Sequence, residues 1–292
     1  MNRANLHALD HTENCDFVHG LLEKRLARGE IDLPLLPEVA IRVMRINASD
    51  LSSAVELAEI IDADATLTAQ VLRVAASAAK RPLTPIVTLR HAVTWLGFDQ
   101  VANIAFTMAL QGRILNVPGQ NHKARRLWRH ALACALWSRH ISHMLAREAA
   151  EGYLSGLLHT IGKPVALAAV HDLAGRSQAK LSFEEYDLLI EIFHRHLGAL
   201  VVRDWGLPEG VQVAATQWEA YAGAGERRLD CNIVHVAHLL ANFTLDDGLQ
   251  DARGLLTLNP AYLDLGFKAE DESALFDAAG SIGKDLASYL PN

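Results

Sequence analysis

Apolar residues recur every three or four positions along most of this 292-residue chain, which is the spacing of one face of an α-helix. Alternation of apolar and polar residues, the pattern of a half-buried β-strand, is hard to find. In the stretch "DADATLTAQVLRVAASA", Asp64 is placed to cap a helix whose apolar stripe includes Leu67, Val71 and Val74. The pattern therefore predicts an all-α fold.

One break divides the helical pattern into two parts. The segment 114–126, "ILNVPGQNHKARR", combines Pro118 and Gly119 with a run of charges, and proline and glycine disfavour a continuous helix. After the break, about five strong helical patterns follow one another, which is enough for a helix bundle. We interpret the segment as the boundary between two helical lobes.

Composition narrows the class of function. Half of the residues are apolar and the formal net charge is -7, so a broad phosphate-binding surface is disfavoured and we expect no nucleic-acid partner. The three cysteines are far apart in the sequence, which suggests neither a disulfide framework nor a thiolate zinc site. We find neither a signal peptide nor the roughly 18 uncharged apolar residues of a membrane span. These features predict a cytoplasmic protein without a membrane partner.

A short basic run follows the boundary between the lobes. It consists of Lys123, Arg125, Arg126 and Arg129. Runs of this kind are usually solvated helix faces, and we interpret this one in that way. The alternative is a contact with a phosphate group or with an acidic partner.

Histidines on successive helices form the candidate site. His130, His159 and His196 come from three consecutive helical patterns and are predicted to point inward, with His238 as a further candidate. No aspartate or glutamate joins this set, so it suits zinc or another transition ion better than magnesium. We favour a structural histidine cluster paired with backbone carbonyls. We therefore expect no cofactor, apart from an adventitious transition metal on His130, His159 and His196.

Seven segments, in this order, resemble the HDOD proteins, bacterial signalling modules related to the HD-type phosphohydrolases. They are "LPLLPEVAIRVMRI", "LAEIIDADATLTAQVLRVAASA", "TLRHAVTWLGFDQVANIAF", "LWRHALACALWSRHIS", "YLSGLLHTIGKPVAL", "HLGALVVRDWGLPEGV" and "IVHVAHLLA". The resemblance implies an all-α, HDOD-type bundle of two lobes, of which the second is built like the HD hydrolase core.

The resemblance also implies how the chain is divided. Residues 33–245 would form the HDOD domain, with an N-terminal helical lobe at 33–118 and an HD-like lobe at 125–245. Residues 1–32 would be an N-terminal helical extension, and residues 246–292 a C-terminal helical extension packed on the domain. Such short flanks leave no room for a further signalling domain, so we expect the input to arrive by binding.

The HD pattern, carried over position by position, marks a remnant pocket. Its positions in this chain are His130, His159, Thr160, His196, Gln217, Trp218 and His238. Thr160 stands where the hydrolases have a bridging carboxylate, Trp218 occupies space that a ligand would need, and His238 replaces an anion by an imidazole. The resemblance therefore implies a site that has lost its hydrolytic chemistry.

Two classes of function compete on this basis. The first is a non-catalytic signalling or scaffolding protein that binds signalling proteins, with a second messenger as a candidate ligand. The second is a metal-dependent phosphohydrolase of nucleotides or cyclic dinucleotides, which the missing carboxylates disfavour. A nucleic-acid binder would depend on the basic run alone.

The apolar stripes predict which side chains form the core. We expect twelve of them to be buried: Leu67, Val71, Val74, Leu96, Ile104, Trp137, Leu157, Leu158, Ile161, Phe193, Trp218 and Leu240. We also expect the side chains of His130, His159 and His196 to approach within about 10 Å of one another, a generous allowance for ligands that lie about 2 Å from a shared ion or are separated by waters. If any one of these three histidines pointed to bulk solvent, the remnant-site interpretation would be removed.

Overall fold

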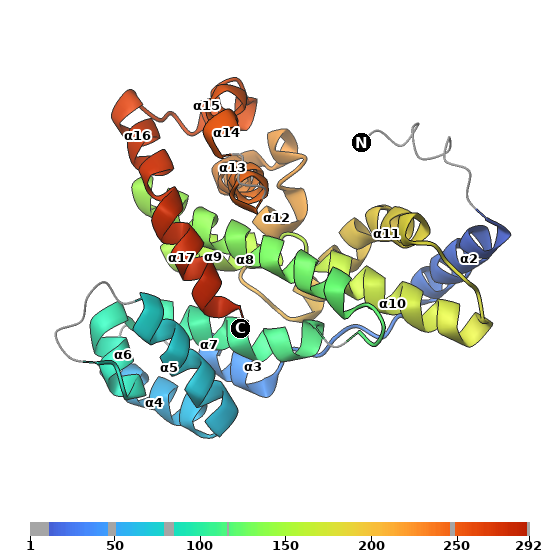
Figure 1. The fold of residues 1–292 in the computed structure, drawn as a ribbon, viewed down its shortest axis with the longest axis horizontal. Helices are drawn as coiled ribbons and strands as arrows, with labels where there is room; N and C mark the ends of the chain where they lie inside the picture. The colour runs from blue at the N-terminus through green and yellow to red at the C-terminus, as the bar shows by residue number, and fades with distance from the viewer. Residues whose placement is uncertain (1–11, 46–50, 79–84, 116, 246–248, 291–292) are drawn as a thin grey trace.

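The computed structural model describes residues 12–45, 51–78, 85–115, 117–245 and 249–290. These residues form helices and connecting turns without any strand, as the sequence predicted (Figure 1). Within the described residues, no helix combines the length and apolar character that a membrane crossing requires.

The first lobe consists of five helices before residue 115. Asp64 caps α5 as predicted, since its carboxylate accepts hydrogen bonds from the backbone N–H groups of Thr66 and Leu67. Gly97 ends α6 with a φ of 86°, a left-handed value that favours glycine. The helices are α3 (Glu38–Arg45), α4 (Leu51–Asp62), α5 (Ala65–Ala78), α6 (Leu89–Leu96) and α7 (Phe98–Ile114).

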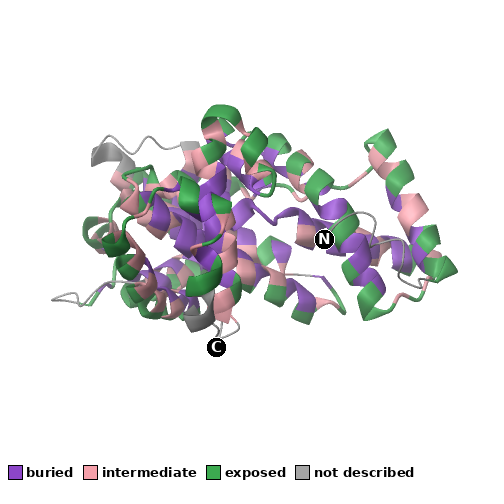
Figure 2. Cartoon of the chain, turned by 90° about the horizontal axis from the view of Figure 1, so that it is seen from above, coloured by how far each residue is buried: buried purple, intermediate pink, exposed green. Residues whose placement is uncertain are grey.

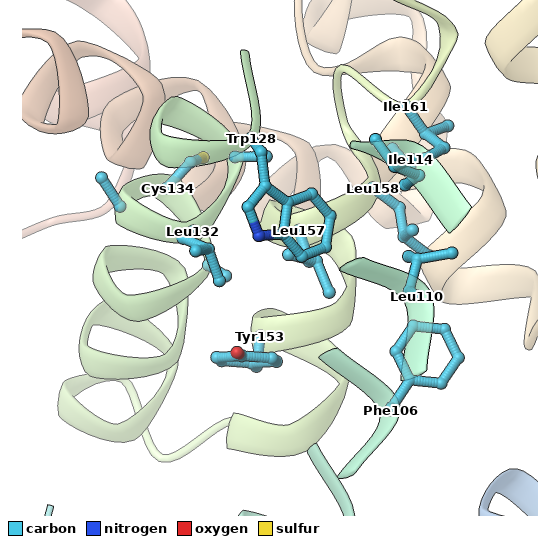
Figure 3. Packing of buried hydrophobic residues seen from close by; sticks show 14 of the residues in the cluster. Phe106, Leu110, Ile114, Trp128, Leu132, Cys134, Tyr153, Leu157, Leu158 and Ile161 are labelled. Carbon is cyan, nitrogen blue, oxygen red and sulfur yellow. The ribbon is translucent and has the colours of Figure 1, made fainter. Parts of the chain in front are cut away.

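The second lobe is a bundle around the long helix α8, which packs extensively against α9 and α13. The lobe consists of α8 (Asn121–Met144), α9 (Ala149–Leu158), α10 (Gly162–Ser177), α11 (Phe183–Asp204), α12 (Glu209–Gln217), the 3-10 turns η1 (Tyr221–Gly223) and η2 (Gly225–Arg227), and α13 (Arg228–Leu245). Figure 3 shows Trp128 and Leu132 of α8 facing Tyr153 and Leu157 of α9, with Phe106 of α7 beside them. The two lobes therefore share a continuous core.

Two helical extensions flank the lobes. Helix α2 (Glu13–Arg28) lies far from the first lobe and packs against α10 and α11 (Figure 1). The C-terminal helices are α14 (Leu249–Leu256), α15 (Pro260–Asp264), α16 (Ala269–Asp277) and α17 (Ala279–Tyr289). Helix α17 contacts both α8 and α5, and Arg73 of α5 donates a hydrogen bond to the backbone carbonyl of Ser288 (2.5 Å). The last helix therefore connects the two lobes.

The predicted core is confirmed at eleven of the twelve positions. Buried residues line the faces between helices (Figure 2), and the eleven side chains are among them. Leu96 is the error, because it is only partly buried at the last position of α6. The three cysteines are buried and unpaired, so no disulfide is present.

Candidate functional site

Three histidines meet in the second lobe. His130 comes from α8, His159 follows the end of α9, and His238 comes from α13. One ring nitrogen of each lies within 4.8 Å of the others. Their ring centroids are 4.7 to 5.5 Å apart. Among the described residues, this is the group of histidine, cysteine and carboxylate side chains that is compact enough for a metal ion.

A tight turn positions His159. Helix α9 ends at Leu158 and α10 begins at Gly162, so His159 lies in the short connection between them. A Cβ atom added to Gly162 would lie 1.7 Å from the backbone carbonyl oxygen of His194, so glycine is required for the close approach of α10 to α11. The turn residue Thr160 is buried and lies in an apolar environment that includes Trp128 and Ile161.

Hydrogen bonds assign the protons on two of the rings. The Nδ1 atom of His159 lies 2.7 Å from the carbonyl oxygen of Gly156. Because a carbonyl can only accept, this nitrogen carries the proton and donates. The Nε2 atom of His159 then accepts from Nδ1–H of His238 at 3.0 Å. A backbone carbonyl that orients the second nitrogen is also the usual arrangement around a metal-binding histidine.

The protein environment disfavours the charged form of these imidazoles. Burial, followed by the neighbouring His238 and His130, lowers the pKa of His159 well below its ordinary value of 6.5. Burial and the neighbouring His130 and Lys163 lower the pKa of His238 to about 3. Both rings are therefore neutral near pH 7, as hydrogen-bonded core residues or metal ligands must be.

An indole closes one side of the cluster. The Trp218 ring is centred 4.4 Å from that of His238 and 5.1 Å from that of His159. Its Nε1–H donates to the backbone carbonyl of His159 (3.3 Å), and the residue is only 7% exposed. The preceding Gln217 is partly buried at the end of α12. Trp218 therefore occupies space beside the histidines that an additional ligand or a substrate would need.

The prediction for His196 is wrong. This residue is exposed on α11, whereas Phe193, His194 and Leu197 face the core. The error is one of helix phase, because His196 lies about 100° around the helix from Leu197. The exposure of His196 removes the remnant site predicted from His130, His159 and His196, and the cluster that does form has His238 in the third place.

A charged network next to the cluster was missed in the sequence. Lys163 donates to Glu191 (2.5 Å), and Nε2 of the buried His194 lies 3.4 Å from the same carboxylate. Burial alone would raise the pKa of Glu191, but hydrogen bonds from His194 and Lys163 outweigh it and lower the pKa to about 2. The spacing of Glu191 and His194 on one helix face was the available signal. Glu191 is not one of the converging ligands.

The basic run is only partly a solvated face. Arg125, Arg126 and Arg129 are exposed as predicted. Lys123 contradicts the prediction because it is 6% exposed. Its ammonium lies 2.6 Å from the Asp187 carboxylate and donates to the backbone carbonyl of Phe183. Lys123 therefore ties α8 to the start of α11, because a buried ammonium needs a paired anion.

Comparisons with solved structures agree on the fold. A protein from Shewanella amazonensis SB2B, provisionally named a metal-dependent phosphohydrolase, is 22% identical with a TM-score of 0.71, covering 96% of this chain and 100% of that one. An HDOD domain protein of unknown function from Geobacter sulfurreducens is 22% identical with a TM-score of 0.69, covering 92% and 98%. At these identities the likeness concerns the fold alone.

The sequence comparisons identify the family. An uncharacterized protein from Treponema pallidum (strain Nichols) is 23% identical over 188 residues, which is 62% of this chain. This chain spans 36% of the length of that relative. The profile of the HDOD domain matches residues 33–221, which confirms the resemblance seen in the sequence. The chain therefore belongs to the HDOD domain family.

Proposed function

We propose that this protein is a non-catalytic signalling or scaffolding module that acts through protein partners in the cytoplasm. The main supporting observation is the composition of the site, in which three imidazoles converge without a carboxylate ligand among the described residues. The site of a metal-dependent phosphohydrolase normally needs anionic oxygens to balance a hard dication and to orient the attacking water. This donor set provides neither.

The geometry around the cluster supports the same conclusion. Trp218 packs against two of the rings, so little room is left for a phosphoester. Lys163, the cation nearest to His159 in the sequence, forms an ion pair with Glu191. A site with these neighbours serves to hold the bundle together. We assign the hydrogen-bonded pair His159 and His238 that structural role.

The donor set does fit a borderline transition ion. Three neutral imidazoles are a known zinc-binding set, whereas magnesium and manganese prefer oxygen ligands. His130, His159 and His238 would hold such an ion, which would supply a Lewis acid. We propose that any such occupancy is adventitious and that signalling does not require it.

The rival function is metal-dependent hydrolysis of nucleotides or cyclic dinucleotides. The provisional name of the Shewanella protein motivates it, and another similar structure, from Marinobacter aquaeolei VT8, is provisionally named a signal transduction protein (22% identical, TM-score 0.65, covering 98% of this chain and 67% of that one). The names point in both directions. Because fold does not determine function, the choice between signalling and hydrolysis depends on the residues of the site.

The test is a phosphoester panel assayed with added manganese. We expect the wild type to show no turnover above background with nucleotides, phosphomonoesters or cyclic dinucleotides. The double variant T160D/H238D should bind manganese more tightly, because two carboxylates enter the site, but Trp218 and Gln217 should still prevent efficient turnover. The matched control is H196A, which removes an exposed imidazole outside the cluster. Wild-type turnover that depends on manganese and is lost in H159A, but kept in H196A, would contradict the proposal.

A further inference from the structure

An apolar surface lies on the two short helices that follow the second lobe. Helices α14 and α15 pack against α13 (Figure 1). Their inward side chains are buried, and these include Leu256, Ala261 and Leu265. The same segment directs Leu255, Leu258 and Leu263 outward, and these side chains are 64%, 79% and 62% exposed. We call these three side chains the leucine surface.

The leucines are grouped rather than scattered. Leu255 and Leu258 are one helical turn apart, and the backbone N–H of Asn259 donates to the carbonyl of Leu256 (2.9 Å), so the turn continues past the end of α14. Leu263 lies on α15, which begins at Pro260. A single exposed leucine is ordinary, whereas grouped apolar side chains in water mark an interaction site.

The chain around the leucine surface is acidic. Residues 253–277 contain five carboxylates, Asp264, Glu270, Asp271, Glu272 and Asp277, and two cations, Arg253 and Lys268. Arg253 forms an ion pair with Glu272 (2.6 Å), and Arg228 of α13 forms one with Asp264. Lys268 offsets one further carboxylate. Two of the five negative charges therefore remain.

Printed contacts bring this negative charge to the border of the leucine surface. Arg253 lies two positions before Leu255 on α14, and its ion pair with Glu272 holds the acidic first turn of α16 beside that helix. Arg253 also lies over the ring of Phe276, 5.3 Å from its centroid. Glu270, in the same turn as Glu272, is exposed. The apolar surface therefore has an acidic border.

These features select one kind of occupant. A second copy of this chain would bring two acidic borders together, and an anionic membrane surface would also be repelled. An extended strand needs a sheet edge, and the described part of the chain has none. A helix presents apolar side chains one turn apart, and flanking lysines or arginines would complement the border.

We propose that the leucine surface binds a basic amphipathic helix of a partner protein. The apolar face of that helix would cover Leu255, Leu258 and Leu263, and its basic flank would lie toward Glu270. This inference rests on the proposed signalling function, for which it names the chemistry of the partner.

The test is a fluorescence anisotropy titration of a labelled peptide with the full chain. The probe is a helical peptide of about 15 residues, built from leucine and lysine with one apolar face. One control peptide has the same composition in scrambled order, and another has glutamate in place of lysine. We expect saturable binding of the probe, binding at least about tenfold weaker for the scrambled peptide, and none for the glutamate peptide.

Apolar variants locate the surface. L258Q/L263Q should weaken binding of the probe at least about tenfold, because two central apolar contacts are lost. The matched control L35Q/V87Q removes two apolar side chains outside the surface, which are 75% and 70% exposed, and should bind as the wild type does. Circular dichroism checks that each variant is folded.

Charge variants test the acidic border. E270K/D277K should weaken binding and reduce its dependence on salt. The matched control E56K/E59K changes the net charge equally at two exposed positions of α4 and should have a smaller effect. Equal effects of the two charge variants would mean general attraction to an acidic protein and would overturn the proposal.

Two further results would overturn it. The first is absence of probe binding by the folded wild type, or an equal loss in L35Q/V87Q. The second is self-association in sedimentation that L258Q/L263Q abolishes, because a second copy would then occupy the surface. Neither result concerns phosphoester turnover, so failure of this inference is distinguishable from failure of the proposed function.

Discussion

The histidine cluster and the cleft between the lobes, a cavity of about 890 Å³ lined by α6, α7, α8 and α17, differ in how closely their side chains are packed and paired. In the cluster, His159 has hydrogen-bond partners on both ring nitrogens, and Trp218 packs over the pair. In the cleft, by contrast, Trp95 is 41% exposed. Side chains that are packed and paired stabilise a fold, whereas an indole at the edge of an open cleft contributes little to it. We therefore assign a structural role to the first region.

The two tryptophans provide the largest contrast. Trp218→Ala should lower the free energy of unfolding by about 3–5 kcal/mol, because it removes a buried ring and leaves a cavity beside the histidines. Trp95→Ala should cost less than about 1 kcal/mol, since much of that side chain is already in solvent. Urea unfolding monitored by circular dichroism measures both. Equal losses would mean that the two indoles have the same structural role.

Apolar side chains near each region give the next contrast. Leu157→Ala and Phe193→Ala should each lower the free energy of unfolding by about 2–5 kcal/mol through lost transfer energy and a cavity. Leu96→Ala, at the partly buried edge of the cleft, should cost about 1 kcal/mol. Denaturant titration of the three variants checks this order. Losses below about 0.5 kcal/mol at both Leu157 and Phe193 would show that neither belongs to the core.

The pH dependence of stability below pH 6.5 should come from the cluster together with His235, whose pKa burial also lowers. The pKa values of His159 and His238 in the folded protein lie below the ordinary value of 6.5, so below pH 6.5 the unfolded chain binds more protons than the folded one. The stability present above pH 6.5 should therefore fall as the pH is lowered, by up to about 1.4 kcal/mol per pH unit for each histidine. For His238 the fall should continue toward pH 3.

Two glutamine substitutions test whether the pH dependence of stability comes from a histidine of the cluster or from one outside it. His238→Gln should make the stability less dependent on pH between 6.5 and 5, because one titrating group is lost. His143→Gln removes an exposed imidazole outside the cluster and is the matched control for the substitution. A wild-type profile that is flat over this range would contradict the assignment of two neutral buried histidines.

The smallest expected effect concerns the network beside the cluster. Glu191→Gln should cost less than about 1 kcal/mol, because the side chain is partly exposed and its pairing with Lys163 is screened by solvent. The cost should shrink at high salt. Glu56→Gln, an exposed position on α4, is the matched control and should have no measurable effect. Thermal unfolding at two salt concentrations tests both. If Glu191→Gln lowered the free energy of unfolding by several kcal/mol, the network would be essential for the stability of the site.

Several features could be predicted because they depend on residues close together in the sequence. Helical periodicity alone predicted the absence of strands, which holds for the part of the chain that the structure describes, and eleven of the twelve buried positions. The Asp64 cap needed only its neighbours along the chain. The placement of His196 failed because a phase error of one residue rotates a side chain by about 100° around a helix. Lys123 was misjudged because its partner Asp187 lies on a different helix.

The sequence by itself therefore determined the fold class, the family and the residue types available for chemistry, including the absence of a carboxylate at Thr160. Only the tertiary structure decided which histidines meet, that Trp218 covers them, and that Trp95 and Asn103 face a cleft with Lys284. The physical reason is that helix periodicity is a local property of the chain. Convergence depends on how helices pack, and packing brings together residues that no local pattern connects.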